Sequence, residues 1–284
     1  MAIKMVFGNQ KGGVGKSTCS YLFTLLLSLR GHKVLLIDMD KQANSTHWLI
    51  NTFNKLHLLN ENTPTIQDAI VNQDFRSAIL PLSENVDIIP NGKDLDGIDI
   101  FLYKMLGDEN HPAFNFYLRK LVSEVEDDYD FIIWDTPPTQ NTYTKNALAA
   151  SDYAIGVVKC ETSSLNGAKD FQDTTNTLGT IMEAMKLKPV QFAGVIIYLF
   201  SSQGTLRREI VEDIKAEFGE LAYENIIKAR DRIERYTKTP VDLDSKLDHH
   251  DKNALRMYDD LLNEILEKVG IEYAKGQPES NSIF

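Results

Sequence analysis

A glycine-rich segment near the start of the chain limits its fold more than any other feature. The segment Asn9–Thr18 (NQKGGVGKST) follows the short apolar run Ile3–Phe7 and opens Ser17–Leu29, which contains neither proline nor glycine. A short apolar run predicts a strand, and a long uninterrupted one predicts a helix. A strand, a glycine-rich loop ending in Lys-Ser and a helix are the surroundings that a phosphate-binding loop requires. We therefore predict that this loop binds a nucleoside triphosphate and that the chain hydrolyses it.

Each residue type in the loop has a physical reason. Glycines let the backbone curl so that successive N–H groups point at phosphate oxygens, and the helix start adds unpaired N–H groups. Lys16 brings positive charge to the β- and γ-phosphates. The hydroxyl of Ser17 suits Mg²⁺, which prefers oxygen ligands. The residues expected to contact the nucleotide are Lys11, Gly12, Gly13, Val14, Gly15, Lys16, Ser17 and Thr18.

The loop departs from the ordinary phosphate loop at two positions. Gln10 stands where the pattern G-x-x-x-x-G-K-[ST] has its first glycine, and Lys11 adds a second lysine early in the loop. Holding phosphates within one subunit does not need this extra lysine. We expect Lys11 to reach the triphosphate of a neighbouring subunit, as a charge supplied in trans.

Two further segments place aspartates directly after apolar runs. Lys33–Ile37 is followed by Asp38 and Asp40, and Phe131–Trp134 is followed by Asp135. The carboxyl ends of parallel strands face the ligand crevice of an open sheet. One carboxylate of the first pair can hold the water shell of a metal while the other orients an attacking water, although a solvated turn would give the same pattern. Asp135 suits the magnesium side. The residues expected at the metal are Ser17, Asp38 and Asp135.

Strand-like runs that alternate with helical patterns predict the fold class. Further runs of this kind are Val86–Ile89, Tyr153–Val158 and Phe192–Tyr198. They are apolar at both alternating positions, as strands covered on both faces must be. The pattern predicts an α/β fold: a single doubly wound, mostly parallel sheet with helices on both faces. Apolar residues at helical spacing from Leu255 to Val269 predict a last helix packed on this body.

No linker divides the chain, so we expect one domain over residues 1–274. Residues 51–62 are polar and poorly patterned and predict an inserted loop. Residues 275–284 (KGQPESNSIF) predict a flexible tail.

In this order, the three motifs resemble those of the ParA family of plasmid and chromosome partition ATPases, which carry a deviant Walker A motif. The resemblance runs from Met1 to about residue 270 and includes NQKGGVGKST, DMDKQANST, YDFIIWDTPPTQNTYTKNALAAS and KCE. It implies a P-loop fold that binds ATP and Mg²⁺. Lys11 resembles the signature lysine that crosses the dimer interface, and Lys16 resembles the Walker lysine. Ser17 resembles the Mg²⁺ ligand, Asp40 the hydrolysis residue of the first switch, and Asp135 the Walker B aspartate.

The resemblance also implies partners. It predicts a homodimer with ATP that binds DNA non-specifically, and a centromere-binding, ParB-like adaptor that stimulates hydrolysis. It implies a cytoplasmic protein that associates with the nucleoid in its ATP state. Two positions depart from the family: Lys41 stands where the family often has proline, and Ile227–Arg230 lacks the proline of the family's Ile-Pro-Arg-Asn stretch near the adenine.

A basic segment is the candidate DNA surface. Five positive charges fall within eleven residues, interrupted by Asp231 and Glu234. If the segment is helical, one face carries Lys228, Arg232 and Arg235 at i, i+4 and i+7, and this face could bind phosphates without reading bases. The alternative is a solvated face with internal ion pairs. Arg207 and Arg208 are weaker candidates. The five residues are Lys228, Arg230, Arg232, Arg235 and Lys238.

Charge and cysteine content weigh against the rival functions. The net charge of −11 argues against a protein coated in positive charge, but leaves room for a local basic patch. A MinD-like membrane-cycling ATPase is the alternative function, yet the last helix is net negative and anionic lipid would repel it. An electron carrier like the nitrogenase reductase would need cluster-ligand cysteines, and Cys19 and Cys160 form no motif. A metabolic ATP-dependent ligase of the same fold stays open.

Overall fold

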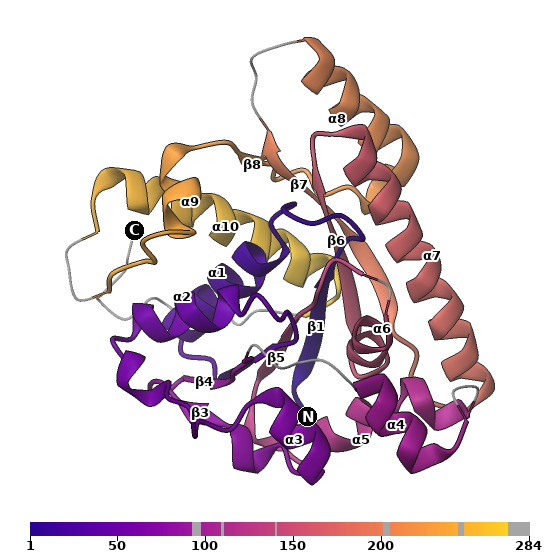
Figure 1. The fold of residues 1–284 in the computed structure, drawn as a ribbon. Helices are drawn as coiled ribbons and strands as arrows, with labels where there is room; N and C mark the ends of the chain where they lie inside the picture. Colours follow the sequence, from indigo (N-terminus) through magenta and orange to yellow (C-terminus); the bar gives the residue numbers. More distant parts are fainter. Residues whose placement is uncertain (93–97, 109–110, 140, 201–204, 244–246, 272–284) are drawn as a thin grey trace.

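A mostly parallel sheet forms the centre of the molecule (Figure 1). The computed structural model describes residues 1–92, 98–108, 111–139, 141–200, 205–243 and 247–271. Within them the strand order is β3-β4-β2-β5-β1-β6-β7-β8, and only β3 pairs antiparallel with its neighbour. The strands are β1 Ile3–Gly8, β2 Val34–Asp38, β3 Leu80–Pro81, β4 Val86–Ile89, β5 Phe131–Asp135, β6 Tyr153–Lys159, β7 Gln191–Phe200 and β8 Ile227–Lys228.

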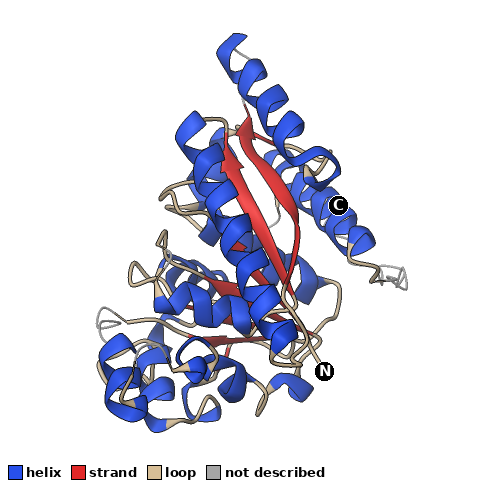
Figure 2. Ribbon diagram, turned by 90° about the vertical axis from the view of Figure 1, so that its right-hand side faces the viewer, coloured by secondary structure: helices blue, strands red, loops and turns tan. Residues whose placement is uncertain are grey.

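Helices cover both faces of the sheet, and Figure 2 shows them flanking the strands. One face packs on α1, α2 and α10, and the other on α3 to α7. Helix α8 packs on β6 and β7. The helices are α1 Lys16–Leu29, α2 Asn44–Thr52, α3 Ile66–Asn72, α4 Ile98–Leu106, α5 Tyr117–Val122, α6 Thr142–Ala149, α7 Thr162–Ala184, α8 Thr205–Phe218, α9 Asp231–Tyr236 and α10 His249–Lys268.

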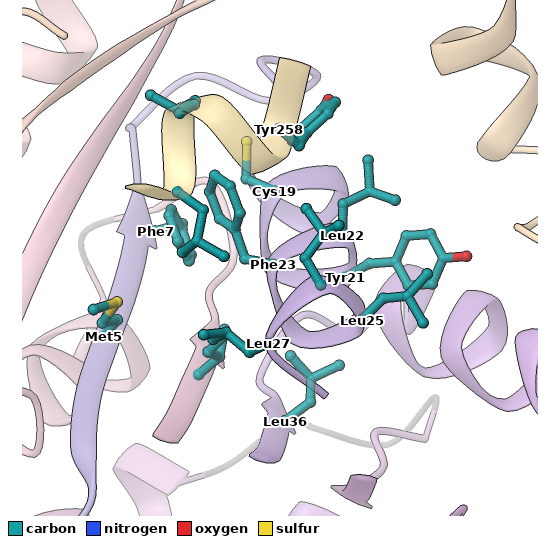
Figure 3. Packing of buried hydrophobic residues seen from close by; sticks show 14 of the residues in the cluster. Met5, Phe7, Cys19, Tyr21, Leu22, Phe23, Leu25, Leu27, Leu36 and Tyr258 are labelled. Atoms are coloured by element: carbon teal, nitrogen blue, oxygen red, sulfur yellow. The ribbon is translucent and has the colours of Figure 1, made fainter. Parts of the chain in front are cut away.

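The strand sequences explain this layering. In β1, Met5 and Phe7 belong to the core cluster under α1, whereas Val6 belongs to the cluster on the opposite face. Successive side chains of a strand point to opposite faces, so a continuously apolar strand needs cover on both. Figure 3 shows Phe7 of β1 beside the side chains of α1, with Phe23 between Phe7 and Tyr258 of α10. Helix α1, which follows the glycine-rich loop, is therefore anchored in the core.

The predicted fold class is confirmed, and the six predicted strands lie within two residues of their observed bounds. The two-residue strands β3 and β8 at the sheet edges were missed, because two residues carry no periodicity. The segment predicted as an inserted loop begins inside α2, and its 3₁₀ turn Leu56–Leu58 is followed by Leu59, which packs against the core. The single domain stays a prediction, and the predicted tail lies outside the described residues.

Candidate nucleotide-binding site

Asn9 fastens the glycine-rich loop to the sheet. Its buried side chain donates from Nδ2 to the carbonyls of Val157 and Ser164, at 2.8 Å each, and accepts at Oδ1 from the backbone N–H of Lys11 at 2.8 Å. A Cβ at Gly167 in α7 would lie 2.3 Å from Asn9 Oδ1, so this contact requires glycine there. The sequence motif included Asn9 but gave it no role; the structure makes it the residue that sets the path of the loop.

Gly15 gives the loop its final turn. Its φ is 107°, in the left-handed region that favours glycine, and an added Cβ would lie 2.3 Å from the ring of Tyr198. Gly15 is also the N-cap of α1 and supplies no side-chain hydrogen bond. The first backbone N–H groups of α1 therefore point at the space in front of the loop, where they favour an anion.

Lys16 lies in the interior of the loop. Its side chain is buried, and Nζ donates to the carbonyl of Lys11 at 3.2 Å. Burial lowers the pKa of Lys16, while the negative charges of Asp135 and Asp40 oppose that shift. A partly desolvated ammonium beside unpaired N–H groups is a strong site for phosphate oxygens.

The aspartates of β2 and β5 meet at the same edge of the sheet. Asp38 and Asp135 are register partners on adjacent strands, and both are fully buried. Asp38 accepts from the N–H of Asp40 at 3.0 Å and from both the N–H and the hydroxyl of Thr46, at 2.9 and 2.7 Å. Burial raises the pKa of Asp38. Since protein donors reach both of its oxygens, Asp38 fixes the turn that carries Asp40; its predicted role at a metal stays a prediction.

Asp135 fits a hard cation. Its Oδ2 is buried and has no hydrogen-bond partner among the described residues. Burial, and then the nearby charge of Asp38, raise its pKa to about 8, while the nearby hydroxyl of Ser17 opposes the shift. No cluster of three or more His, Cys, Asp or Glu side chains in the described chain could hold a metal alone. Mg²⁺ commonly takes one or two protein oxygens together with nucleotide phosphates, so Ser17 and Asp135 fit that ion.

Lys11 faces away from Lys16. Its Nζ pairs with the carboxylate of Glu161 and donates to the hydroxyl of Ser163 at 2.6 Å. Glu161 also pairs with Lys159 at 3.3 Å. The hydrogen bond from Lys11 holds the pKa of Glu161 below its ordinary value. In this single chain, then, the second lysine of the loop lies outside the pocket and contacts its own subunit.

One pocket of about 690 Å³ opens over the loop. Residues of the loop line it at Gly12, Gly13, Gly15, Lys16, Ser17 and Thr18, and further lining residues are Asp40, Pro137, Pro138, Thr139 and Asn141. A further part of the lining comes from α2, β7, α9 and the residue after α9, and sequence reasoning missed it because these residues share no motif. Those residues are Trp48, Tyr198, Ile233, Glu234 and Thr237.

The structure corrects the expected basic face. Lys228 ends the edge strand β8, and of the five basic residues only Arg232 and Arg235 lie in the six-residue helix α9, so the shared helical face is wrong. Arg232 forms ion pairs with Asp248 and with Asp251 at the start of α10, and its side chain is 20% exposed. The other four basic residues are exposed: Lys228, Arg230, Arg235 and Lys238.

Comparison with known proteins agrees with this geometry. The family model described as AAA domain (AAA_31) matches residues 2–187. The chromosome-partitioning ATPase Soj of Treponema pallidum is 29% identical over 80% of this chain and 83% of its own length. The sporulation initiation inhibitor protein Soj of Bacillus subtilis is 30% identical over 79% of this chain and 83% of its own length. The chromosome partitioning protein ParA of Myxococcus xanthus is 28% identical over 79% of this chain and 75% of its own length. The chain belongs to the ParA family of partition ATPases.

Solved structures extend the likeness to the ParA fold. A putative plasmid partition protein from Borrelia burgdorferi B31, bound to AMPPNP, is 25% identical, with a TM-score of 0.73 over 94% of this chain and 100% of that one. A McdA variant from Cyanothece in complex with ATP is 18% identical, with a TM-score of 0.76 over 96% and 98%. Cobyrinic acid a,c-diamide synthase from Mycobacterium smegmatis is 23% identical, with a TM-score of 0.64 over 77% and 83%. The last two likenesses concern the fold alone.

Two further observations bear on the rivals of a ParA protein. Cys19 and Cys160 are both buried and unbonded to each other, in α1 and after β6. None of the described helices is long and apolar enough to cross a membrane.

Proposed function

We propose that this protein is an ATP-dependent partition ATPase for plasmid or chromosome segregation. In this proposal it binds ATP and Mg²⁺ as a sandwich dimer, binds DNA non-specifically in the ATP state, and hydrolyses ATP when a centromere-binding, ParB-like protein stimulates it. Its working place is the nucleoid. The observation that carries the proposal is the joint placement of Lys16, Ser17 and Asp40 around one pocket, with Lys11 outside it.

The residues divide the chemical work as follows. The N–H groups of the loop and the ammonium of Lys16 bind the β- and γ-phosphates. Ser17 and Asp135 hold Mg²⁺, which neutralises phosphate charge when it is bound. Asp40 lies at the pocket wall with Oδ1 accepting from the N–H of Gln42 at 3.0 Å, so its position is fixed. From there it orients the attacking water.

In the dimer, Lys11 leaves Glu161 and contacts the partner's triphosphate. A lysine placed there in trans stabilises the charge that builds on the transferred phosphate. Hydrolysis removes the γ-phosphate and with it the charge that holds Lys11 across the interface. Nucleotide therefore controls the dimer, and the dimer doubles every exposed basic group that one subunit presents to DNA.

Binding to a duplex of arbitrary sequence tests this function. Filter binding with ATP, with ADP and without nucleotide is expected to show retention of DNA mainly with ATP. Phosphate release is expected to be slow alone and faster with the cognate adaptor. Equal DNA binding in all three nucleotide conditions would refute the proposed switch.

The described part of the chain does not favour a MinD-like membrane-cycling role. The apolar side chains of α10, such as Leu255, Leu262 and Ile265, are buried in the core and are not available to lipid. Flotation with anionic liposomes and ATP separates the two functions, because only a membrane-cycling protein would float.

A further inference from the structure

The part of the pocket lining that comes from α2 and α9 has a different chemistry from the loop that binds phosphate. Trp48 comes from α2, and Ile233 and Thr237 come from α9 and its C-terminal end. Ile233 is buried and Trp48 is half-buried. An aromatic and an apolar side chain in a wall of this kind suit a flat, weakly polar group rather than phosphate.

The order of the loop residues shows which group reaches this wall. Asp40, Asp135 and Ser17 mark the side of the γ-phosphate and Mg²⁺. We expect the nucleoside to extend from the loop toward the part of the lining that has no phosphate-binding group, formed by Trp48, Ile233 and Thr237. Trp48 lies close to α1, because its ring centre is 6.0 Å from that of Tyr21, which is one turn along α1 from Thr18.

Trp48 is held in place before any ligand arrives. Its Nε1 donates to the carbonyl of Thr237 at 3.0 Å, which joins α2 to the end of α9 across the pocket. Tyr21 supports the same corner, because its hydroxyl contacts Thr52 Oγ1 at 2.6 Å and accepts from the N–H of Val241 at 2.9 Å. These contacts hold the ring in place, so the side chain of Trp48 loses little conformational entropy when a base binds.

We propose that Trp48 is a base-binding residue of the nucleotide site, whose indole forms the aromatic wall against which the purine ring packs. This inference rests on the proposal that ATP occupies the loop. Stacking of a base on an aromatic ring is favourable and depends on the ring area, so a purine gains more than a pyrimidine. The ring provides the contact, while the hydrogen bond to Thr237 positions the ring.

Three variants separate the ring from its position and from general damage. Trp48→Ala removes the ring, and Trp48→Phe keeps an aromatic ring but removes the N–H donor. Phe53→Ala is the matched control, because Phe53 is half-buried just after α2 and does not line the pocket. Isothermal titration compares ATP, ADP and inorganic tripolyphosphate, which has no base.

We expect Trp48→Ala to weaken ATP and ADP binding about ten-fold and to leave tripolyphosphate binding unchanged. Unchanged tripolyphosphate binding also shows that the loop of the variant is folded. Trp48→Phe is expected to bind ATP within about three-fold of the wild type, because a ring remains. ATP affinity in Trp48→Ala equal to that of the wild type would overturn the proposal, and so would a Trp48→Phe protein as weak as Trp48→Ala.

Intrinsic fluorescence gives an independent readout. The chain has two tryptophans, and the other one, Trp134, is fully buried in β5. We expect ATP to change the emission of the wild type more than tripolyphosphate does, and this difference to vanish in Trp48→Phe. An undiminished difference in that variant would contradict a base contact at Trp48.

These outcomes separate the inference from the proposed function. A wild-type protein that binds neither ATP nor tripolyphosphate would refute the nucleotide site itself. A wild-type protein that binds both, together with a Trp48→Ala variant of normal ATP affinity, would refute only the role of Trp48.

Discussion

Lys11 and Lys16 belong to one loop and have opposite surroundings. Lys16 is buried and bonded within the loop, whereas Lys11 reaches outward to Glu161 and Ser163. The buried ammonium gains most from a phosphate, because it has lost water and has few other partners. The outer ammonium already has a partner in its own subunit. The two lysines should therefore fail in different ways when they are removed.

Lys16→Ala is expected to abolish ATP binding, because it removes the charge at the β- and γ-phosphates. Equilibrium titration with a labelled nucleotide measures the loss. Lys159→Ala, which removes a half-buried lysine outside the pocket, serves as the control. Unchanged affinity in Lys16→Ala would show that the loop does not bind phosphate.

The pairing of Lys11 with Glu161 should oppose dimer formation. We expect Lys11→Ala to keep more nucleotide affinity than Lys16→Ala but to lose ATP-dependent dimerisation and hydrolysis. Glu161→Gln should have the opposite effect and lower the ATP concentration at which the dimer forms. The change should be no more than a few-fold, because both side chains are about 40% exposed and exposed ion pairs contribute little free energy. Light scattering across an ATP series measures both. A normal ATP-bound dimer in Lys11→Ala would show that Lys11 does not act in trans.

Asp40→Ala is expected to bind ATP and to remain dimeric with little turnover. The hydrogen bond from the N–H of Asp40 to Asp38 stays in this variant and holds the turn. The substitution removes the carboxylate, and with it the bond that Oδ1 accepts from the N–H of Gln42, without removing a phosphate contact. Single-turnover phosphate release measures the effect. Hydrolysis at the wild-type rate would take Asp40 out of the mechanism.

At the scale of elements, the short helix α9 has two sides. One side contributes Ile233 and Thr237 to the pocket, and the other exposes Arg235, with Lys238 just beyond its end. Arg232 ties α9 to the start of α10 through its ion pairs with Asp248 and Asp251. Because α9 also lines the nucleotide pocket, we expect the position of this basic surface to change with the bound nucleotide.

Removing Arg235 and Lys238 together is expected to weaken ATP-dependent DNA binding for all sequences alike. The slope of log affinity against log salt should fall by about two, because each removed side chain neutralises one phosphate. Arg232→Ala is the contrasting variant, because it should instead lower the urea midpoint of unfolding by leaving Asp248 and Asp251 without their partner. Normal DNA affinity in the double variant would place the surface elsewhere, with Arg207 and Arg208 next.

The elements also show what the sequence can predict. The strands and the phosphate loop were predictable because each has a local pattern, and the aspartates followed from their place after apolar runs. The contacts of Lys11 with Glu161 and of Trp48 with Thr237 were not, because they join residues 150 and 189 positions apart. The helical face with Lys228 failed because edge pairing with β7, a tertiary effect, took that residue into a strand.

At the scale of the whole molecule, the net charge of −11 makes DNA binding depend on a small area. Charges further away than about 10 Å are screened at ordinary salt, so the acidic remainder does not prevent a local contact. It does mean that attraction comes from few groups. Dimerisation then becomes the main way to raise affinity.

We therefore expect ATP-bound protein to bind duplex of any sequence, with affinity falling steeply between low and physiological salt. ADP-bound protein should bind much less at every salt concentration. Fluorescence anisotropy with two unrelated duplexes at several salt concentrations measures this. Affinity that ignores salt, or that differs strongly between the two duplexes, would contradict a phosphate-binding surface.

The two ends of the sheet limit how copies of this chain can join. Each outer strand is only two residues long, and β3 contains Pro81, which has no N–H to offer a neighbouring chain. Such ends are poor templates for cross-β growth, even though the sheet between them is long and strongly apolar. We therefore expect this protein at high concentration to resist fibril formation, and any ordered polymer to be reversible and to grow through side-chain contacts between globular subunits.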